Sequence, residues 1–413
     1  MELRTGEPYW AIRNGLLHSY PPVRSDQSAE VVVLGAGITG ALIARALAVA
    51  GADVLVVDRH DVGMGSSAAS TGLLQYATDS SLTCLADQLG EEDAVTAYKM
   101  GRDAVSTIEA LCLEVGDASG FQRRPSLYLA SSETARGLLQ REYLLQKQHG
   151  FEVSWLNRKG IEGSYSFDGA AALHCEGDGE VDCYRLVHAL MADSARRGVR
   201  VFDRTEIVRI TTGRSGVVVE TDRGHRITAG RFVSAAGYQT EDELLRTPAT
   251  LASTWAIASE PVDSFDGWDD RCLIWETARP YFYLRTTDDG RIIAGGRDVS
   301  SPSRHESRWQ LQRQTDALAK RVRKMFPAMA LEVAYRWGGA FASTADSLPI
   351  VGTRPEFPNT WFALGYGGNG ITFSVMAAEI IRDAYRGLEH PAADLFKFDR
   401  PSLSPGYALR RRA

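Results

Sequence analysis

The sequence predicts an α/β fold in which a nucleotide-binding domain is interrupted by segments that build a second, antiparallel sheet. Three observations lead to this prediction. A strand–turn–helix–strand unit begins near residue 30, a second glycine-rich loop joins a buried strand to a helix near residue 365, and alternating strands occupy much of the chain between them. We therefore expect both glycine loops to belong to one parallel sheet that the chain leaves and rejoins.

The first unit extends from residue 30 to residue 58. Residues 30–34 form a short apolar run bounded by glycine, which is typical of a parallel strand buried on both faces. Residues 41–50 are rich in helix formers, and Gly51 is a natural helix end. Residues 53–58 form a second apolar run that ends in an acid. This order predicts a Rossmann-like unit.

The turn inside this unit carries a Gly-x-Gly-x-x-Gly pattern made of Gly35, Gly37 and Gly40. The first glycine permits the tight turn, the second lets the backbone approach a pyrophosphate, and the third lets the helix pack close to the sheet. The helix N-terminus offers N–H groups to the phosphates, and Asp58 lies where a carboxylate meets a ribose hydroxyl. We expect a dinucleotide site rather than a bare turn. The glycines and Arg45 argue against a membrane span here.

Composition restricts the class of protein. The chain has 413 residues, of which 44% are hydrophobic and 24% charged, and a net charge of −6, so nothing suggests nucleic acid or an acidic membrane as a partner. Its five cysteines lack C-x-x-C spacing and its eight histidines lack metal-ligand spacing, so we expect reduced thiols and no metal site. Because no export signal is visible at Met1, we expect a cytoplasmic protein.

Two segments flank the first unit. Residues 1–28 form an irregular extension whose aromatic side chains we expect to pack back onto the body. Residues 63–72 form a loop rich in glycine and serine, which exposes backbone N–H groups and hydroxyls. Such a loop suits a phosphate or a flavin ring edge, and the alternative is a solvated linker. Its place directly after the second strand favours the ligand role.

The chain then leaves the first domain. Residues 80–118 show helical apolar spacing, and after a short strand residues 132–149 form another helix, with Ser132 as its N-cap. A helix at residues 185–197 and several strands follow. The buried strand at residues 231–237 ends in a glycine turn, which predicts a return to the first domain.

A second excursion begins near residue 249. Alternation places Tyr281, Tyr283 and Arg285 on one face of a strand, and Asp288-Asp289-Gly290 forms a hairpin turn. A charged amphipathic helix follows. The chain returns through the buried strand at residues 361–364 into the loop Gly365-Tyr366-Gly367-Gly368-Asn369-Gly370 and a last helix. The predicted divisions are an N-terminal extension (1–28), a cofactor domain (29–83, 180–246 and 334–398) and a substrate domain (84–179 and 247–333).

One long cofactor explains this order better than a nicotinamide dinucleotide, whose enzymes usually use two consecutive strand–helix halves. Its adenosine half would lie on residues 35–58, and a ring at its far end would lie against residues 367–372. The last helix would point its N-terminus at that ring and stabilise the negative charge of a reduced flavin. FAD fits this arrangement.

Six stretches carry a resemblance to a known protein family. In chain order they are VVVLGAGITGALIARALAVAGADVLVVD, GMGSSAASTG, GEVDCYRLVHAL, FVSAAG, WGGAFASTADSLPIVG and GYGGNGITFS. With them the chain resembles the FAD-dependent oxidoreductase family of D-amino-acid oxidase, glycine oxidase and sarcosine oxidase. Pro-Tyr-Trp at residues 8–10 is similar to the amine-oxidising branch that includes gamma-glutamylputrescine oxidase. The resemblance implies FAD-binding residues in both loops and in segments between them: Gly35, Gly37, Ile38, Thr39, Gly40, Asp58, Arg59, Ser66, Ser67, Gly72, Val208, Ala236, Gly237, Gly339, Gly368, Asn369, Gly370, Ile371 and Thr372.

Three features of the sequence depart from the family pattern. Where glycine oxidase and D-amino-acid oxidase carry an arginine for the substrate carboxylate, this chain has Phe341, so Arg285 or Arg279 would have to replace it. Where sarcosine oxidase attaches its flavin through a cysteine, this chain has Gly339, so we expect non-covalent FAD. Residues 249–319 contain no lysine to promote reaction with oxygen. The sequence therefore leaves open whether the enzyme is an oxidase that uses oxygen or a dehydrogenase that passes its electrons to another acceptor.

The resemblance implies oxidation of the C–N bond of a small amine or amino acid by hydride transfer to flavin N5, giving an imine that hydrolyses. This chemistry needs mainly positioning and exclusion of water. Tyr281, Tyr283 and Arg285 are the candidate catalytic residues, and Trp275 and Phe341 are weaker candidates. For the aromatic residues the alternative is core packing, and for Arg285 a surface charge. Two other functions remain open: a FAD-dependent dehydrogenase of a 2-hydroxy acid or polyol, and an electron-relaying flavoprotein subunit of a larger complex.

Overall fold

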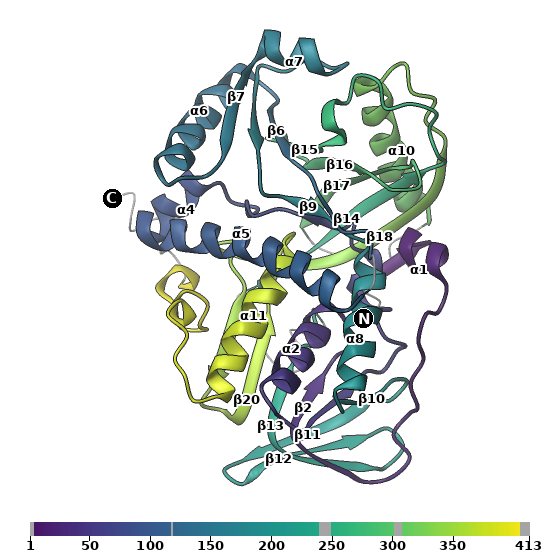
Figure 1. The fold of residues 1–413 in the computed structure, drawn as a ribbon, viewed down its shortest axis with the longest axis vertical. Coiled ribbons are helices and arrows are strands. Elements are labelled where there is room, and N and C mark those ends of the chain that lie inside the picture. The colour runs from purple at the N-terminus through teal and green to yellow at the C-terminus, as the bar shows by residue number, and fades with distance from the viewer. Residues whose placement is uncertain (1–3, 117–118, 239–248, 301–307, 405–413) are drawn as a thin grey trace.

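The computed structural model describes residues 4–116, 119–238, 249–300 and 308–404. Two large sheets dominate it, one of eight strands and one of nine, and a small sheet of three strands completes the fold. In Figure 1 the eight-stranded sheet and its helices occupy the lower half of the molecule and the nine-stranded sheet the upper half. Helix α5 (Glu91–Glu114) lies across the middle.

The eight-stranded sheet is the predicted cofactor sheet. Its strands are β10 (Arg200–Phe202), β3 (Val54–Val57), β2 (Gln27–Leu34), β13 (Arg226–Ser234), β12 (Gly216–Thr221) and β11 (Ile207–Gly213), with β20 (Phe357–Leu364) beside β13 and β19 (Ile350–Arg354) beside β20. The pairs β10/β3, β3/β2, β2/β13 and β13/β20 are parallel. Ser234 of β13 is paired with Leu34 on one side and Phe362 on the other, so β2, β13 and β20 end at the same edge of the sheet, and β20 continues slightly further to Leu364. The prediction that the chain rejoins its first sheet is confirmed.

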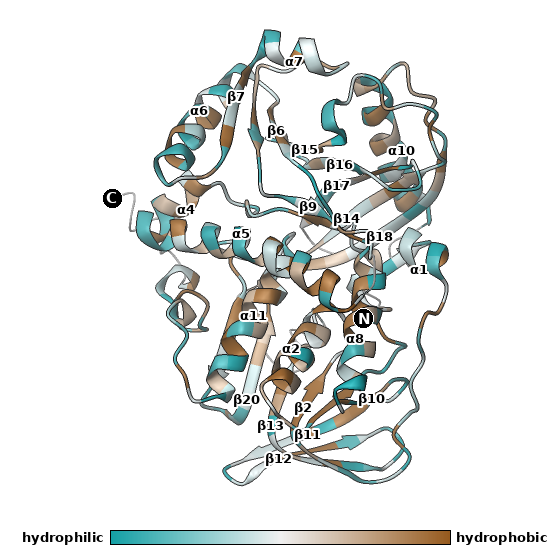
Figure 2. Cartoon of the chain, in the orientation of Figure 1, coloured by the Kyte–Doolittle hydropathy of each residue, from teal (hydrophilic) through white to brown (hydrophobic). Residues whose placement is uncertain are grey.

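Three helices cover one side of this sheet: α2 (Ile38–Val49), α8 (Cys183–Arg196) and α11 (Gly370–Tyr385). Helix α2 packs against both α8 and α11. The hydroxyls of Thr39 and Ser374 are 2.8 Å apart, which joins the first turns of α2 and α11. Figure 2 shows β2 and α2 as largely hydrophobic, and Val31, Val32 and Val33 are all buried, as expected for a strand covered on both faces.

The nine-stranded sheet is the predicted substrate sheet. Its order is β1 (Arg4–Gly6), β18 (Val333–Thr344), β14 (Ala249–Ser259), β17 (Ile292–Ser300), β16 (Phe282–Thr286), β15 (Leu273–Glu276), β6 (Ser126–Ala130), β8 (Ala171–Cys175) and β7 (Val153–Asn157). All neighbours are antiparallel except β15 and β6. The predicted boundary at residue 334 is wrong, because β18 pairs with β14 along its length and therefore belongs to this sheet.

The remaining elements connect or cover the two sheets. They are α1 (Tyr9–Asn14), α3 (Ser66–Ala69), α4 (Leu82–Leu89), α6 (Glu133–Gln148), α7 (Arg158–Ser164), α10 (Arg308–Met325) and the small-sheet strands β4 (Leu73–Leu74), β9 (Gly179–Glu180) and β5 (Gln122–Arg123). Ser132 caps α6 as predicted, since its hydroxyl accepts the Ala135 N–H at 3.1 Å. Among the described residues, no helix has the length and apolar character that crossing a membrane requires.

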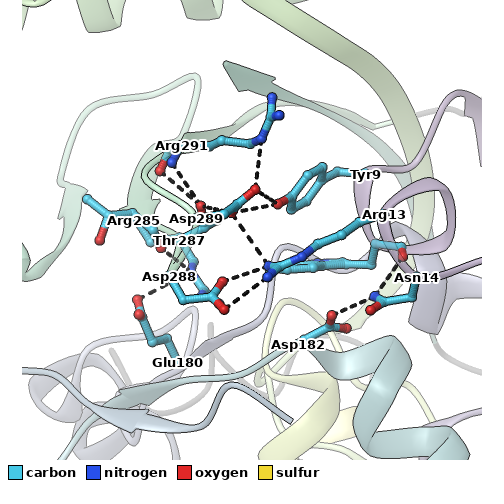
Figure 3. A network of polar contacts seen from close by, with 12 residues as sticks. Tyr9, Arg13, Asn14, Glu180, Asp182, Arg285, Thr287, Asp288, Asp289 and Arg291 are labelled. Atoms are coloured by element: carbon cyan, nitrogen blue, oxygen red, sulfur yellow. Dashed lines mark hydrogen bonds and ion pairs between the residues drawn. The ribbon is translucent and has the colours of Figure 1, made fainter. Parts of the chain in front are cut away.

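The N-terminal extension packs back onto the body, as predicted. Tyr9 and Trp10 of α1 are each 1% exposed. Two contacts tie the extension to the β16–β17 hairpin: Tyr9 donates its hydroxyl to Asp289 at 2.7 Å, and Arg13 pairs with Asp288 at 2.6 Å (Figure 3). Strand β1 adds a further edge to the substrate sheet. The extension is therefore more regular than its sequence indicated.

Gly40→Ala tests the close packing of α2 on the first turn. A Cβ at Gly40 would lie 1.8 Å from the carbonyl oxygen of Gly35, so the helix must move. We expect a loss of about 3 kcal/mol in the free energy of unfolding, measured by urea denaturation. The control is Gly137→Ala in α6, where no atom lies within 4 Å of the added Cβ and stability should not fall. Equal stability of both variants would contradict the packing argument.

Candidate active site

A cavity of about 980 Å³ lies between the two sheets, and both glycine-rich loops line it. This volume is at the upper end of the range for small-molecule and cofactor sites. The cofactor sheet contributes the ends of β2, β3 and β13, and the substrate sheet contributes residues of β14, β16, β17 and β18. One cavity therefore joins segments that are hundreds of residues apart.

The first loop forms one end of this cavity. Gly35 has φ of +109°, and a Cβ there would lie 2.4 Å from the Ala235 carbonyl oxygen, so only glycine fits. The Asp58 carboxylate accepts the N–H groups of Ala36 at 2.7 Å and His60 at 2.8 Å, which fixes its position. Burial raises the pKa of Asp58 above its usual value, and these two N–H donors oppose that rise. The ordered carboxylate is placed as a ribose-binding acid must be.

The second loop brings another helix N-terminus to the cavity. Gly367 has φ of +53°, and the Gly368 N–H is donated to Asp79 at 2.8 Å. Asn369 precedes α11 but makes no side-chain cap, since its amide is donated to the carbonyl oxygens of Gln75 and Ala77. Helix α2 also begins without a side-chain cap. Both helices thus present N-terminal N–H groups that need acceptors.

These donors fit FAD. Ser66 Oγ and Gln75 Nε2 line the cavity and are buried without a hydrogen-bond partner among the described residues. At Gly37 an added Cβ would stand 3.1 Å from Ser67 Oγ, which itself accepts the Ile38 N–H at 2.9 Å. A long ligand with phosphate oxygens in its middle and carbonyl oxygens on a ring would satisfy these groups.

Most of the predicted cofactor residues line the cavity: Gly35, Gly37, Ile38, Thr39, Asp58, Arg59, Ser66, Ser67, Ala236, Gly237, Gly339, Gly368, Asn369, Gly370, Ile371 and Thr372. Gly40, Gly72 and Val208 do not. Gly40 lies behind the turn, where it has the packing role expected of it. Gly72 faces the Val181 carbonyl: an added Cβ at Gly72 would lie 2.1 Å from that carbonyl oxygen. Val208 is 61% exposed because strand alternation turns its neighbour Ile207 to the cavity instead.

Tyr281 and Tyr283 form a wall of the cavity, as predicted. Their ring centroids are 5.6 Å apart. Gly295 stands opposite Tyr283 on β17, and a Cβ there would lie 2.3 Å from the tyrosine hydroxyl oxygen, so this glycine makes room for the ring. Of the weaker candidates, Phe341 also lines the cavity. Trp275 does not, because it stacks on Tyr128 with centroids 3.6 Å apart.

Arg285 is not at the cavity, so its predicted catalytic position is wrong. Arg285 points to the same side of the strand as Tyr283. At Arg285, however, the backbone around Gly72 and Val181 covers that side. Its Nη1 donates to the carbonyls of Gly72 at 2.8 Å and Val181 at 3.0 Å. Its Nε is 3.3 Å from the Glu180 carboxylate, and both side chains are almost completely buried (Figure 3). Arg285 therefore holds backbone segments together.

The loop at residues 66–72 is held by side chains that the sequence did not identify. Trp10 donates its indole N–H to the Ser70 carbonyl at 2.9 Å, and Trp337 donates to the Ala69 carbonyl at 2.8 Å. The Cys183 thiol donates to the Ser67 carbonyl at 2.9 Å. Segments from three distant parts of the chain thus position this loop against the cavity.

Four further cavity residues had no recognisable motif: Arg4, Asp79, Thr254 and Asp298. Arg4 reaches the site because β1 pairs with β18, which places Arg4 opposite Gly339. Asp79 lies shortly after the glycine- and serine-rich loop, and that proximity is the one signal in the sequence that could have indicated it. The other two depend on the register of the substrate sheet.

The fold and the site together define a dinucleotide-dependent enzyme. Enzymes of this class bind the phosphates at helix N-termini and the ribose at an acid after the second strand, and one long cavity here joins both features. The family model described as FAD dependent oxidoreductase matches residues 30–384. The chain belongs to that family, and FAD is its cofactor.

Relatives extend over nearly the whole chain. Glycine oxidase of Geobacillus kaustophilus (strain HTA426) is 25% identical over 399 residues, which cover 89% of this chain and 96% of that enzyme. The probable oxidoreductase OrdL of Rhizobium meliloti (strain 1021) is 23% identical over 417 residues, covering 95% and 91%. The crystal structure of the Geobacillus kaustophilus glycine oxidase has a TM-score of 0.77 at 21% identity, covering 92% of this chain and 99% of that one. The predicted fold is confirmed, and the gamma-glutamylputrescine oxidase branch stays a prediction.

Gly37→Val tests the pyrophosphate position. The larger side chain would fill the space beside Ser67 Oγ, so we expect a folded but colourless protein, measured by the ratio of flavin absorbance to protein and by circular dichroism. The matched control is Gly213→Val, where no atom lies within 4 Å of the added Cβ and flavin content should be unchanged. Full flavin content in Gly37→Val would count against the assigned site.

Arg285→Met tests the structural role of that arginine. Removal of the guanidinium leaves Glu180 buried with Arg124 at 3.3 Å as its remaining ion-pair partner, so we expect a loss of about 3 kcal/mol in the free energy of unfolding. The double variant Arg285→Met/Glu180→Gln should recover part of this loss in a double-mutant cycle of urea denaturation curves. An unchanged unfolding free energy together with weakened substrate binding would restore the catalytic interpretation.

Proposed function

We propose that this enzyme oxidises the C–N bond of a small amine or amino acid, with FAD as the hydride acceptor. The observation that carries the proposal is the position of Tyr283, on β16 of the substrate sheet, and of Tyr281 directly before that strand: both line the same cavity as the second glycine loop. A small molecule held between this wall and the loop would lie against the ring of the cofactor. The names of the relatives, glycine oxidase and the L-proline dehydrogenase from P. horikoshii, support the choice of an amine nitrogen.

The L-proline dehydrogenase structure has a TM-score of 0.75 at 20% identity, and the match covers 91% of this chain and 99% of that one.

Bound FAD supplies the redox chemistry, so the protein has mainly to bind the substrate, orient it and exclude water. Burial raises the pKa of Tyr281 and of Tyr283 well above the ordinary value, so both hydroxyls stay protonated at neutral pH. The wall is therefore aromatic and uncharged, which suits an amine that must react in its neutral form.

Non-covalent attachment of FAD is part of the proposal. Gly339 has no side chain that could bond to a flavin. Cys183 lines the cavity, but burial raises the pKa of its thiol to about 12, and the protonated thiol is a poor nucleophile. Acid precipitation should release all of the flavin into the supernatant, and flavin that stays with the pellet would show a covalent bond.

Anaerobic reduction tests the proposed activity. The purified holoenzyme is mixed under nitrogen with amines, amino acids, 2-hydroxy acids and polyols, and the flavin absorbance is followed. We expect amines or amino acids to bleach the flavin and the alcohols to leave it oxidised. Bleaching by a 2-hydroxy acid alone would establish the alcohol-dehydrogenase alternative, and bleaching by dithionite only, with co-purifying proteins, would favour the electron-relaying subunit. Readmission of oxygen then shows whether the enzyme is an oxidase.

A further inference from the structure

The tyrosine end of the cavity differs in charge from the nucleotide end. Among the described residues, the charged side chains that line the cavity near Tyr281 and Tyr283 are Asp79 and Asp298. Of the basic residues that line the cavity, Arg59 and His60 follow β3, at the adenosine end, and Arg4 lies on the edge strand β1 opposite Gly339.

Asp79 is held in a fixed position at this end. Its Oδ2 accepts the Gly368 N–H at 2.8 Å, and a Cβ on Gly368 would be 2.7 Å from Oδ1. The absence of a side chain at Gly368 therefore lets the carboxylate lie directly on the second loop. Desolvation raises the pKa of Asp79 and the Gly368 N–H opposes this rise. The Asp79 side chain is nevertheless exposed to the cavity that it lines. The carboxylate is available to a ligand there.

Asp298 approaches the same space from β17. Burial raises the pKa of its carboxyl to about 6, the hydroxyl of Thr254 opposes this rise, and the charge of Asp79 adds to it. The two carboxyl groups face the same part of the cavity, so the charge of one disfavours the charge of the other. A cation between them would relieve this repulsion, whereas a carboxylate would add to it.

The aromatic wall independently favours a cation. Tyr281 and Tyr283 present two rings with centroids 5.6 Å apart at an interplanar angle of 47°, and Phe341 also lines the cavity. Faces of aromatic rings attract ammonium groups through their quadrupoles, most strongly where water is excluded. Rings and carboxylates together form the kind of surface that binds an organic cation.

Building on the proposed function, we propose that the substrate is an amine that carries a second cationic group and no carboxylate near the reacting carbon, with Asp79 and Asp298 as its specificity-determining residues. The second ammonium or guanidinium group would lie between the two carboxylates against the tyrosine wall. The amine to be oxidised would then lie toward the glycine loop. A simple α-amino acid would place its carboxylate beside Asp79.

Arg279 is the competing explanation. Its guanidinium stacks over the Tyr281 ring at 5.0 Å, it is exposed, and its charge lowers the pKa of Asp79 and Asp298. It does not line the cavity. If it turned inward it could bind a carboxylate, and the substrate would then be an amino acid. The experiment must therefore separate these two substrates.

The test uses four probes with five-carbon chains that carry different charged groups: 1,5-diaminopentane, pentylamine, 5-aminopentanoate and 2-aminopentanoate. Their dissociation constants are measured by calorimetry on the dithionite-reduced holoenzyme under nitrogen, because reduced flavin cannot accept a hydride and no turnover intervenes. We expect the diamine to bind at least about tenfold more tightly than pentylamine, and both carboxylates to bind more weakly than pentylamine. Flavin bleaching rates of the oxidised enzyme should follow the same order.

The variants Asp79→Asn and Asp298→Asn keep the side-chain shape and remove the charge. In either variant the preference for the diamine over pentylamine should fall toward one, while FAD content stays at the wild-type level. Asp263→Asn, in an exposed loop outside the cavity, is the control and should keep the full preference. Arg279→Met should also keep it.

Two results would overturn the proposal. The first is a wild-type preference near one, or a preference that neither aspartate variant changes. The second is tightest binding of 2-aminopentanoate that Arg279→Met abolishes, which would make Arg279 the carboxylate-binding residue. Because binding is measured without turnover, these results differ from failure of the proposed oxidation, in which the diamine binds as expected but no amine or amino acid bleaches the flavin.

Discussion

The structure depends on three neighbouring parallel strands, β2, β13 and β20, that end at the same edge of the sheet. Ser234 of β13 pairs with Leu34 of β2 and Phe362 of β20, so the turns after β2 and β20 emerge at the same edge of the sheet. Helices α2 and α11 therefore begin side by side, and the hydroxyls of Thr39 and Ser374 join their first turns. In open α/β sheets this edge is where ligands bind. The register of one strand thus brings both helix N-termini to a single cavity.

Close backbone contact at this edge requires glycine. Gly35 turns back against Ala235 with a positive φ, and Gly40 lies against the Gly35 carbonyl at a distance that excludes a Cβ. The adjoining loop at residues 66–72 ends in another such glycine, Gly72, which lies against the Val181 carbonyl. Hydrogen bonds from Trp10, Trp337 and Cys183, which come from three separate parts of the chain, position the rest of the loop. The cofactor site therefore includes the N-terminal segment and the substrate sheet as structural partners.

The two ends of the cavity are built for different tasks. The nucleotide end offers backbone N–H groups and an ordered carboxylate, which suit phosphates and ribose. The other end offers aromatic rings and the carboxyl groups of Asp79 and Asp298, which suit the proposed cationic substrate. Arg285 illustrates how burial decides function: the same guanidinium that could bind a substrate carboxylate is fully used by backbone carbonyls and Glu180.

The sequence alone determined the cofactor domain, because strand, turn, helix and acid follow one another within a few dozen residues and each has a local chemical signature. It also determined both glycine loops and the two tyrosines, through strand alternation. Tertiary structure decided the rest. Alternation could not show where along the strand the cavity ends, so Arg285 was misplaced, and it could not show that β18 stays in the substrate sheet. Asp79, Asp298 and Arg4 reach the cavity through pairings between segments far apart in the chain, and such pairings leave no local pattern because they depend on how the whole core packs.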